Sequence, residues 1–287
     1  MRALGAALLL ALILGGVIAV RAARASTGDF HPARPASIEW PSGVQDVPGR
    51  IEVSFPSPLG DTIRGWYVPS TNGAAIALVP GTTSDRRHFV PEIAALGNGL
   101  FGVLAFDLPG AGLSDGRVTW GASERAALSA AVAWLRAADH VQHVGVVGFS
   151  QGSYTAVQVA AGEPAIEALV LEGAVGSYEH VTRQEFGQWG WLTAYPAILA
   201  RRSAGYDVSE PRAIDVMRRY AGPVLFVNGS ADRDVPRSEA DALYAEARGR
   251  KETLTIEGAG HGAYARVPGD YLARLVAFFE RTLTHHA

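Results

Sequence analysis

Residues 148–152 read Gly148-Phe149-Ser150-Gln151-Gly152, which is a G-x-S-x-G motif. The apolar run before it, at 144–147, predicts a buried strand, and residues 153–161 predict a helix. A serine held on so sharp a strand-to-helix turn forms a nucleophile elbow, with its hydroxyl exposed. The turn strains the serine backbone, and only small residues fit two positions before and after it. Because the motif is short and can arise by chance at such a turn, the rest of the chain decides its meaning.

A serine hydroxyl is a weak nucleophile at neutral pH, so it needs a base, and the base needs a carboxylate that orients it. The apolar run at 223–227 predicts another buried strand, and Asp232 follows it on a glycine-containing loop. His261 lies between two glycines, after a predicted strand at 254–256. Both side chains therefore follow strand ends, in the chain order Ser, Asp, His. Asp234, two residues beyond Asp232, is the alternative acid.

Short apolar segments alternate with helical ones along most of the chain. They predict strands at 51–55, 62–68, 75–79, 101–106, 141–147 and 166–171. The Pro-Leu-Gly-Asp turn at 58–61 makes the first two strands an antiparallel pair, and a long helix is predicted over 122–138. This alternation predicts an α/β fold in which a mostly parallel sheet is covered by helices on both faces.

Over residues 50–283 the chain resembles the α/β-hydrolase superfamily. The resemblance is carried, in order, by Pro-Gly-Thr at 80–82, by Asp-Leu-Pro-Gly-Ala-Gly-Leu-Ser at 107–114, by the elbow, and by the two loops that hold Asp232 and His261. Together these segments are far more specific than any one of them alone. The resemblance implies the α/β-hydrolase fold with a short helical cap after the sixth strand.

The resemblance also implies roles for five residues. Ser150 is the expected nucleophile and His261 the expected base. Asp232 is the expected orienting acid, because the family spacing from the preceding glycine favours it over the other aspartate. The backbone N–H groups of Thr82 and Gln151 are the expected oxyanion hole, which stabilises charge in the tetrahedral intermediate.

Two loops beside the expected site need separate interpretation. Many members of the superfamily have His-Gly where this chain has Pro80-Gly81. Proline lacks a backbone donor, but the donor required belongs to Thr82, so the oxyanion hole is retained. Asp107 is interpreted as an organiser that accepts backbone hydrogen bonds from its own loop, with Gly110 and Gly112 supplying the turn conformations.

The expected cap, at about 174–211, interrupts the strand and helix alternation and holds five aromatic residues within 178–195. We expect Phe186, Trp189 and Trp191 to contact an acyl or aryl group of the substrate and to exclude water. The alternative is that these aromatic side chains only pack the cap against the sheet.

A serine nucleophile favours a carboxylic ester or thioester substrate that is cleaved through an acyl-enzyme. Dehalogenases and epoxide hydrolases of similar fold need a carboxylate at the elbow, so serine argues against both. A peptidase or amidase of the serine aminopeptidase-like type is the alternative, in which Glu179 or Glu185 would hold the substrate amine. A catalytically silent binding module with this fold is the third possibility.

Composition limits the remaining possibilities. The chain has 287 residues, of which 48% are apolar, enough for one α/β domain at 49–287 after a Pro-, Ser-, Gly- and Ala-rich linker at 26–48. The net charge of −3 does not indicate a basic surface for binding nucleic acid, and the sequence contains no cysteine. Because zinc-ligand spacings and nucleotide-binding fingerprints are missing from the sequence, we expect no cofactor and no metal. The expected partner is a small-molecule acyl substrate.

The first 25 residues are interpreted as a separate hydrophobic segment. Leu4 to Val20 is a run of seventeen apolar or glycine residues, flanked by Arg2 and by Arg21. This length is at the lower limit for a membrane-spanning helix and exceeds the usual core of a signal peptide. We expect an uncleaved single-helix membrane anchor with the catalytic domain outside the cytoplasm. An A-x-A site at 23–25 keeps open cleavage of a signal and a secreted or periplasmic protein.

Overall fold

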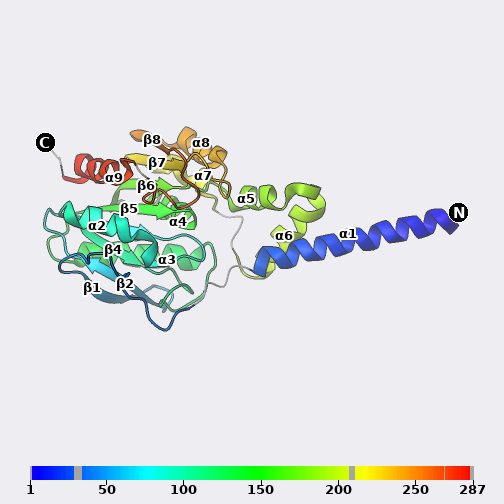
Figure 1. Ribbon diagram of the computed structural model, residues 1–287, viewed down its shortest axis with the longest axis horizontal. Coiled ribbons are helices and arrows are strands. Elements are labelled where there is room, and N and C mark those ends of the chain that lie inside the picture. Colours follow the sequence, from blue (N-terminus) through cyan, green and yellow to red (C-terminus); the bar gives the residue numbers. More distant parts are fainter. Residues whose placement is uncertain (1, 29–33, 207–210, 268, 285–287) are drawn as a thin grey trace.

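A computed structural model describes residues 2–28, 34–206, 211–267 and 269–284, with side chains from residue 12 onward apart from that of residue 28. Residues 29–33 of the expected linker and 207–210 of the expected cap lie outside the described ranges. An eight-stranded sheet forms the body of the molecule, and one long helix projects from it (Figure 1).

The strands are β1 (Ile51–Pro56), β2 (Thr62–Val68), β3 (Ala74–Val79), β4 (Gly102–Phe106), β5 (His143–Phe149), β6 (Ile166–Glu172), β7 (Val224–Gly229) and β8 (Lys251–Ile256). Their order in the sheet is β1-β2-β4-β3-β5-β6-β7-β8. β2 pairs antiparallel with β1 and β4, and the pairs from β4 to β8 are parallel. The predicted fold class and the antiparallel first pair are therefore confirmed, and the predicted strand ends agree within three residues.

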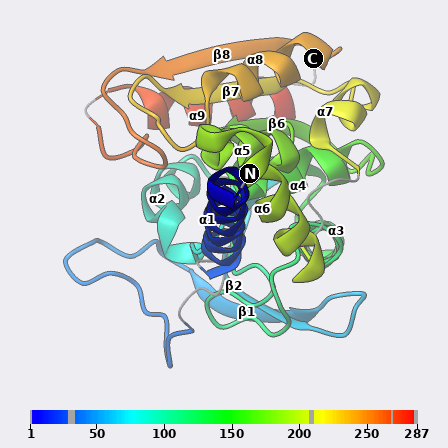
Figure 2. The ribbon, with the colours of Figure 1, turned by 90° about the vertical axis from the view of Figure 1, so that its right-hand side faces the viewer.

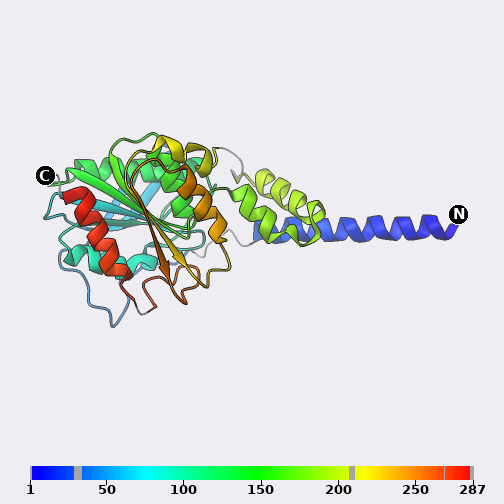
Figure 3. The same cartoon turned by 90° about the horizontal axis from the view of Figure 1, so that it is seen from above.

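The helices are α1 (Arg2–Gly28), η1 (Arg86–Phe89), α2 (Val90–Asn98), α3 (Ala122–Ala137), α4 (Gln151–Ala160), α5 (Tyr178–Glu185), η2 (Gly187–Trp189), α6 (Trp191–Ser203), α7 (Ala213–Val216), η3 (Met217–Arg219), α8 (Arg237–Glu246), α9 (Tyr271–Phe279) and η4 (Glu280–Thr284). Helices α2 and α9 pack on one face of the sheet, and α3, α4 and α8 pack on the other. Figure 3 shows the sheet between these two helix layers.

The middle strands are buried on both faces, as expected for parallel strands covered by helices. In β3, Ala75, Ala77 and Val79 belong to the core under α3 and α4. The alternate side chains Ile76 and Leu78 belong to the core under α2 and α9. This burial fixes the register of the strands, so that their carboxyl ends, and the loops that follow them, meet at one edge of the sheet.

The cap lies between β6 and β7, where it was expected, and consists of α5, η2 and α6. It stands on the same side of the body as α1, and Figure 2 looks along α1 with the cap beside it. Helix α1 continues to Gly28, beyond the predicted boundary at residue 25. Its last turn packs against α6: Ser26 is buried, and its hydroxyl lies 2.8 Å from the carbonyl oxygen of Ala23 and 3.2 Å from that of Ala197.

In the part of the chain that the structure describes, no helix combines the length and the apolar character needed to cross a membrane. The expected membrane anchor is therefore not supported, and the location of the domain at 49–287 stays a prediction.

Candidate active site

Ser150 occupies the turn between β5 and α4 with φ 52° and ψ −112°, a strained backbone for a residue with a side chain. The flanking glycines are required by close backbone contacts. A Cβ on Gly148 would lie 2.4 Å from the carbonyl oxygen of Gly152, and one on Gly152 would lie 1.9 Å from that of Val79. These contacts leave room only for glycine at positions 148 and 152, as predicted from the motif.

His261 and Asp232 are brought together from separate loops. The Nδ1 atom of His261 lies 2.8 Å from Oδ2 of Asp232, within hydrogen-bonding distance. The other carboxylate oxygen accepts from the backbone N–H groups of Asp234 at 2.9 Å and Val235 at 3.1 Å. Burial raises the pKa of Asp232, but the hydrogen bonds and the histidine outweigh it, so the net pKa is lowered. Asp234 is exposed and does not contact the histidine in this way.

Ser150 and His261 line the same cavity. No hydrogen bond joins them among the described residues, which is common before substrate binds. The imidazole is held on two sides. The Phe149 ring lies 4.7 Å from it, and Gly173, with φ 53°, approaches so closely that a Cβ there would lie 2.9 Å from Cε1. Gly173 directly follows β6 and was not identified from the sequence.

The two residues expected to form the oxyanion hole also meet. The Thr82 hydroxyl donates to Oε1 of Gln151 at 2.9 Å, which ties the loop after β3 to the first turn of α4. Gly81 lies against the serine, since a Cβ on it would be 3.1 Å from the Ser150 Cβ. The loop therefore brings the backbone of residues 81–82 next to the nucleophile, at the amino end of α4, where backbone N–H groups lack helical partners.

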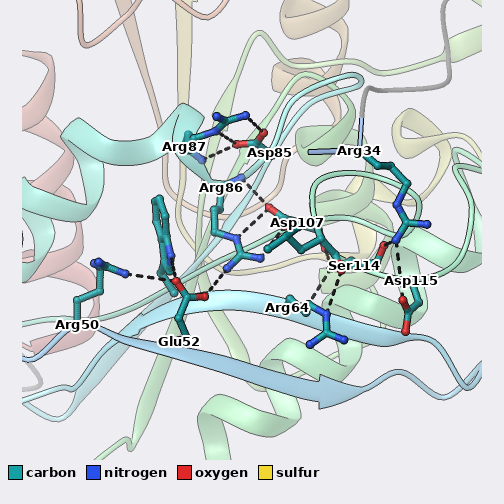
Figure 4. Close-up of polar contacts among 12 residues, drawn as sticks. Arg34, Arg50, Glu52, Arg64, Asp85, Arg86, Arg87, Asp107, Ser114 and Asp115 are labelled. Atoms are coloured by element: carbon teal, nitrogen blue, oxygen red, sulfur yellow. Dashed lines mark hydrogen bonds and ion pairs between the residues drawn. The ribbon is translucent and has the colours of Figure 1, made fainter. Parts of the chain in front are cut away.

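Asp107 is completely buried and organises the loop after β4, as the sequence suggested (Figure 4). Its carboxylate accepts from the backbone of Leu113 at 2.8 Å and of Arg86 at 2.9 Å. No sequence pattern indicated the role of Arg86, whose guanidinium binds the same carboxylate at 2.7 Å and also Glu52 at 2.9 Å. Gly112, with φ 50°, leaves the space that this carboxylate occupies.

The cavity above Ser150 has a volume of about 410 Å³. Its apolar lining includes Trp120, Val175, Tyr178 and Val181, and the Trp120 and Tyr178 rings stack with centroids 4.5 Å apart. The polar lining includes Arg201, whose guanidinium lies 4.9 Å from the Trp120 ring centre. Trp120 precedes α3, far from the cap in sequence, and no local pattern marked it.

The structure does not bring Phe186, Trp189 and Trp191 to this cavity. Trp189 and Trp191 are 64% and 80% exposed, because η2 and the start of α6 carry them away from the sheet. Phe186 instead packs on the outer side of Arg201, with the guanidinium 5.3 Å from its ring centre. These three side chains therefore do not line the cavity at Ser150, whose aromatic lining is Trp120 and Tyr178, and their contact with a substrate stays a prediction.

The two carboxylates considered as holders of a substrate amine are both ion-paired. Glu185, at the cavity, binds the buried Arg201 at 2.9 Å. Glu179 binds Arg183 at 2.7 Å and Arg202 at 3.6 Å. In addition, no group of three or more acidic, histidine or cysteine side chains within the described ranges could hold a metal ion.

Two buried glutamates, Glu92 and Glu172, were not recognised from the sequence. Glu172 ends β6 with its side chain fully buried, and its carboxyl accepts a hydrogen bond from Tyr271. Its backbone carbonyl accepts from the N–H of Ser150 at 2.8 Å. Burial raises the pKa of Glu172 to about 7, although the Tyr271 hydroxyl opposes the rise. Burial, reinforced by Glu172, also raises the pKa of Glu92.

This pair predicts a pH-dependent stability. Between pH about 4.5 and 7 the folded state keeps a proton on Glu172 that the unfolded state releases, so the free energy of unfolding should fall as pH rises. The change expected from Glu172 alone is about 3 kcal/mol. Glu172→Gln should make this dependence less steep in chemical denaturation curves, leaving the part that Glu92 contributes, whereas Glu257→Gln, at an exposed glutamate, should leave it unchanged. An equally steep dependence in Glu172→Gln would contradict the assignment.

Comparison with known proteins agrees with the fold. A family model described as the alpha/beta hydrolase fold matches residues 75–195. The chain is 29% identical to the uncharacterized protein Rv2307c of Mycobacterium tuberculosis over 270 residues, covering 91% of this chain and 88% of that protein. It is 24% identical to the uncharacterized protein YfhR of Escherichia coli K12, covering 79% of each chain.

Solved structures show the same architecture. The esterase Pf2001 of Pyrococcus furiosus superposes with a TM-score of 0.72 at 21% identity, covering 88% of this chain and 99% of that one. Est1E of Butyrivibrio proteoclasticus, solved with ferulic acid bound, gives a TM-score of 0.63 at 20% identity, covering 80% and 96%. The chain therefore has the α/β-hydrolase fold, on which the family model and these structures agree.

Proposed function

We propose that this protein is a serine hydrolase that cleaves a carboxylic ester or thioester through an acyl-enzyme. The observation that carries the proposal is the cavity that Ser150 shares with His261. The Nδ1 atom of this histidine lies 2.8 Å from Oδ2 of Asp232. The esterases among the solved structures of the same fold are consistent with it.

In the proposed reaction, the Ser150 oxygen attacks the substrate carbonyl carbon while Nε2 of His261 takes the hydroxyl proton. The carbonyl oxygen becomes an oxyanion, which the backbone N–H groups of Thr82 and Gln151 stabilise. When the intermediate collapses, the bond to the leaving group breaks and His261 returns the proton to that group. Water then repeats these steps on the acyl-enzyme and releases the acid.

Asp232 supports this cycle without giving up its own charge. Its lowered pKa keeps it ionised at neutral pH, so it can stabilise the imidazolium that forms when His261 takes the proton. The peptidase alternative receives less support, because the carboxylates that would hold a substrate amine already bind arginines.

The cavity lining favours an uncharged acyl group, because its apolar wall includes Trp120, Val175, Tyr178 and Val181.

The test combines substrate turnover with covalent labelling of the full chain. We expect hydrolysis of p-nitrophenyl esters in a series from acetate to palmitate, and a fluorophosphonate adduct that peptide mapping locates on Ser150. Labelling without ester turnover would favour an amide substrate. The absence of both, in a protein that unfolds cooperatively, would favour the silent binding module.

A further inference from the structure

Helix α6 has an apolar stripe on its outer side. Trp191, Tyr195 and Leu199 are spaced four residues apart and therefore lie on one face of the helix. They are 80%, 56% and 43% exposed, and Trp189 just before the helix is 64% exposed. The neighbouring face of α6, with Ala194, Ala197 and Ile198, is buried in the cap. A helix whose apolar residues span so wide an arc is normally covered over that whole arc.

Helix α1 extends this apolar surface. A Cβ on Gly15 would lie 3.8 Å from Leu192, and further along the same two helices Ser26 binds Ala197 and Arg201. The two helices thus lie side by side, and α1 continues beyond the end of the cap (Figures 1 and 3). Its exposed large apolar side chains are Leu12, Ile13, Leu14, Val17 and Val20.

These residues make one unusual surface, which we call the cap–α1 surface: Leu12, Ile13, Leu14, Val17, Val20, Trp189, Trp191, Tyr195 and Leu199. Only four other large apolar side chains are exposed among the described residues, and they lie at separate places: Val44, Ile51, Leu59 and Leu100. Monomeric soluble proteins rarely expose so concentrated an apolar patch unless it is an interaction site.

The chemistry of the surface favours lipid over protein as its partner. Tryptophan and tyrosine are the residues enriched where a protein crosses from hydrocarbon to headgroups, and three of them lie on the cap beside a wholly aliphatic stretch of α1. Helix α1 contains no acidic residue, and Arg21 and Arg24 follow its apolar stretch. Arginines in this position complement anionic headgroups.

We propose that the cap–α1 surface docks on a lipid bilayer that contains anionic headgroups, with the cap aromatics at the interface. The same cap covers the cavity, since Val181, Gln184 and Glu185 of α5 line it. Docking therefore presents the cavity to the bilayer. Building on the proposed esterase function, we assign its substrate class as esters with an apolar acyl chain that partition into the lipid.

The test uses the full-length protein and vesicles of phosphatidylcholine alone or mixed equally with phosphatidylglycerol. We expect co-flotation with the mixed vesicles, stronger than with phosphatidylcholine alone. The triple variant Trp189→Ser, Trp191→Ser, Tyr195→Ser should lower the partition coefficient by about tenfold or more, because binding scales with buried apolar area. The matched control Ile51→Ser, Leu59→Ser removes exposed apolar side chains elsewhere and should bind as the wild type does.

Vesicle binding and ester hydrolysis are measured separately. Ser150→Ala should bind vesicles normally, so a failed esterase assay leaves the docking result interpretable. If the esterase proposal holds, the triple variant should lose turnover of a long-chain ester embedded in vesicles while keeping turnover of soluble p-nitrophenyl butyrate. The proposal would be overturned if the wild-type protein bound neither kind of vesicle, or if the triple variant bound the mixed vesicles as well as the wild type does. Sedimentation showing a dimer that the triple variant dissociates, without vesicle binding, would assign the surface to a second copy instead.

Discussion

Replacing Ser150 with alanine is expected to lower kcat/KM for the best p-nitrophenyl ester by about 10⁴- to 10⁶-fold. The substitution removes only the hydroxyl oxygen that attacks the carbonyl. Alanine keeps the Cβ, and hence the strained φ of 52° at the elbow, so the melting temperature should change little. The measurement is steady-state hydrolysis by wild type and variant purified side by side, with fluorophosphonate labelling expected to vanish in parallel.

The control for this experiment is Ser238→Ala, which removes an exposed hydroxyl from α8 and should leave turnover unchanged. Residual activity within about tenfold of the wild type would assign the reaction to a different nucleophile, since removing a catalytic serine costs far more. A large loss of activity together with a large drop in melting temperature would indicate that the elbow had collapsed. Circular dichroism and thermal unfolding of the same samples separate this outcome from a chemical effect.

The features that could be predicted from the sequence are those that local geometry imposes. The elbow glycines at 148 and 152 are needed because backbone atoms lie within 2.4 Å of where a Cβ would be. Asp232 and His261 follow strand ends, and parallel strands bring their carboxyl ends to one edge. In each case a short run of residues contains both the signal and its physical cause.

The lining of the cavity could not be predicted in this way. Trp120 and Tyr178 stack on each other although 58 positions separate them, and only the assembled fold brings them together. A dense group of aromatics in the cap predicted contact with substrate, but sequence density does not say which face of a helix turns inward. The four-residue spacing of Trp191, Tyr195 and Leu199 was the available signal, and it indicated a single shared face.

Buried charge was the other feature hidden from the sequence. Glutamates are usually solvent-exposed, so nothing in the sequence around Glu92 and Glu172 indicated that both are buried. Arg201 similarly resembles its exposed neighbour Arg202, yet it is buried and joins α1 to the cap by donating to the Ser26 carbonyl at 3.0 Å. Such groups are identified by what surrounds them, which depends on elements far away in the chain.

Exchanging Asp232 for asparagine is expected to lower kcat by about 10⁴-fold, whereas Asp234→Asn should leave it near the wild-type value. The carboxylate lies 2.8 Å from Nδ1 of His261 and can only accept a hydrogen bond, which keeps the proton on Nδ1 and leaves Nε2 free to take one from Ser150. An asparagine amide can donate to Nδ1 instead. The imidazole would then carry its proton on Nε2 and could not act as the base.

Two neighbouring aspartates make this comparison well controlled. Both substitutions remove one negative charge from the same loop, so a general electrostatic effect would appear in both variants. Asp232 also accepts from the backbone N–H groups of residues 234 and 235 and from the Tyr264 hydroxyl at 3.3 Å. Thermal unfolding must therefore accompany the kinetics, to show that the Asp232→Asn loop stays folded. A greater loss in Asp234→Asn would transfer the role of the acid to Asp234, and equal losses would show that the loop acts through its charge rather than through the histidine tautomer.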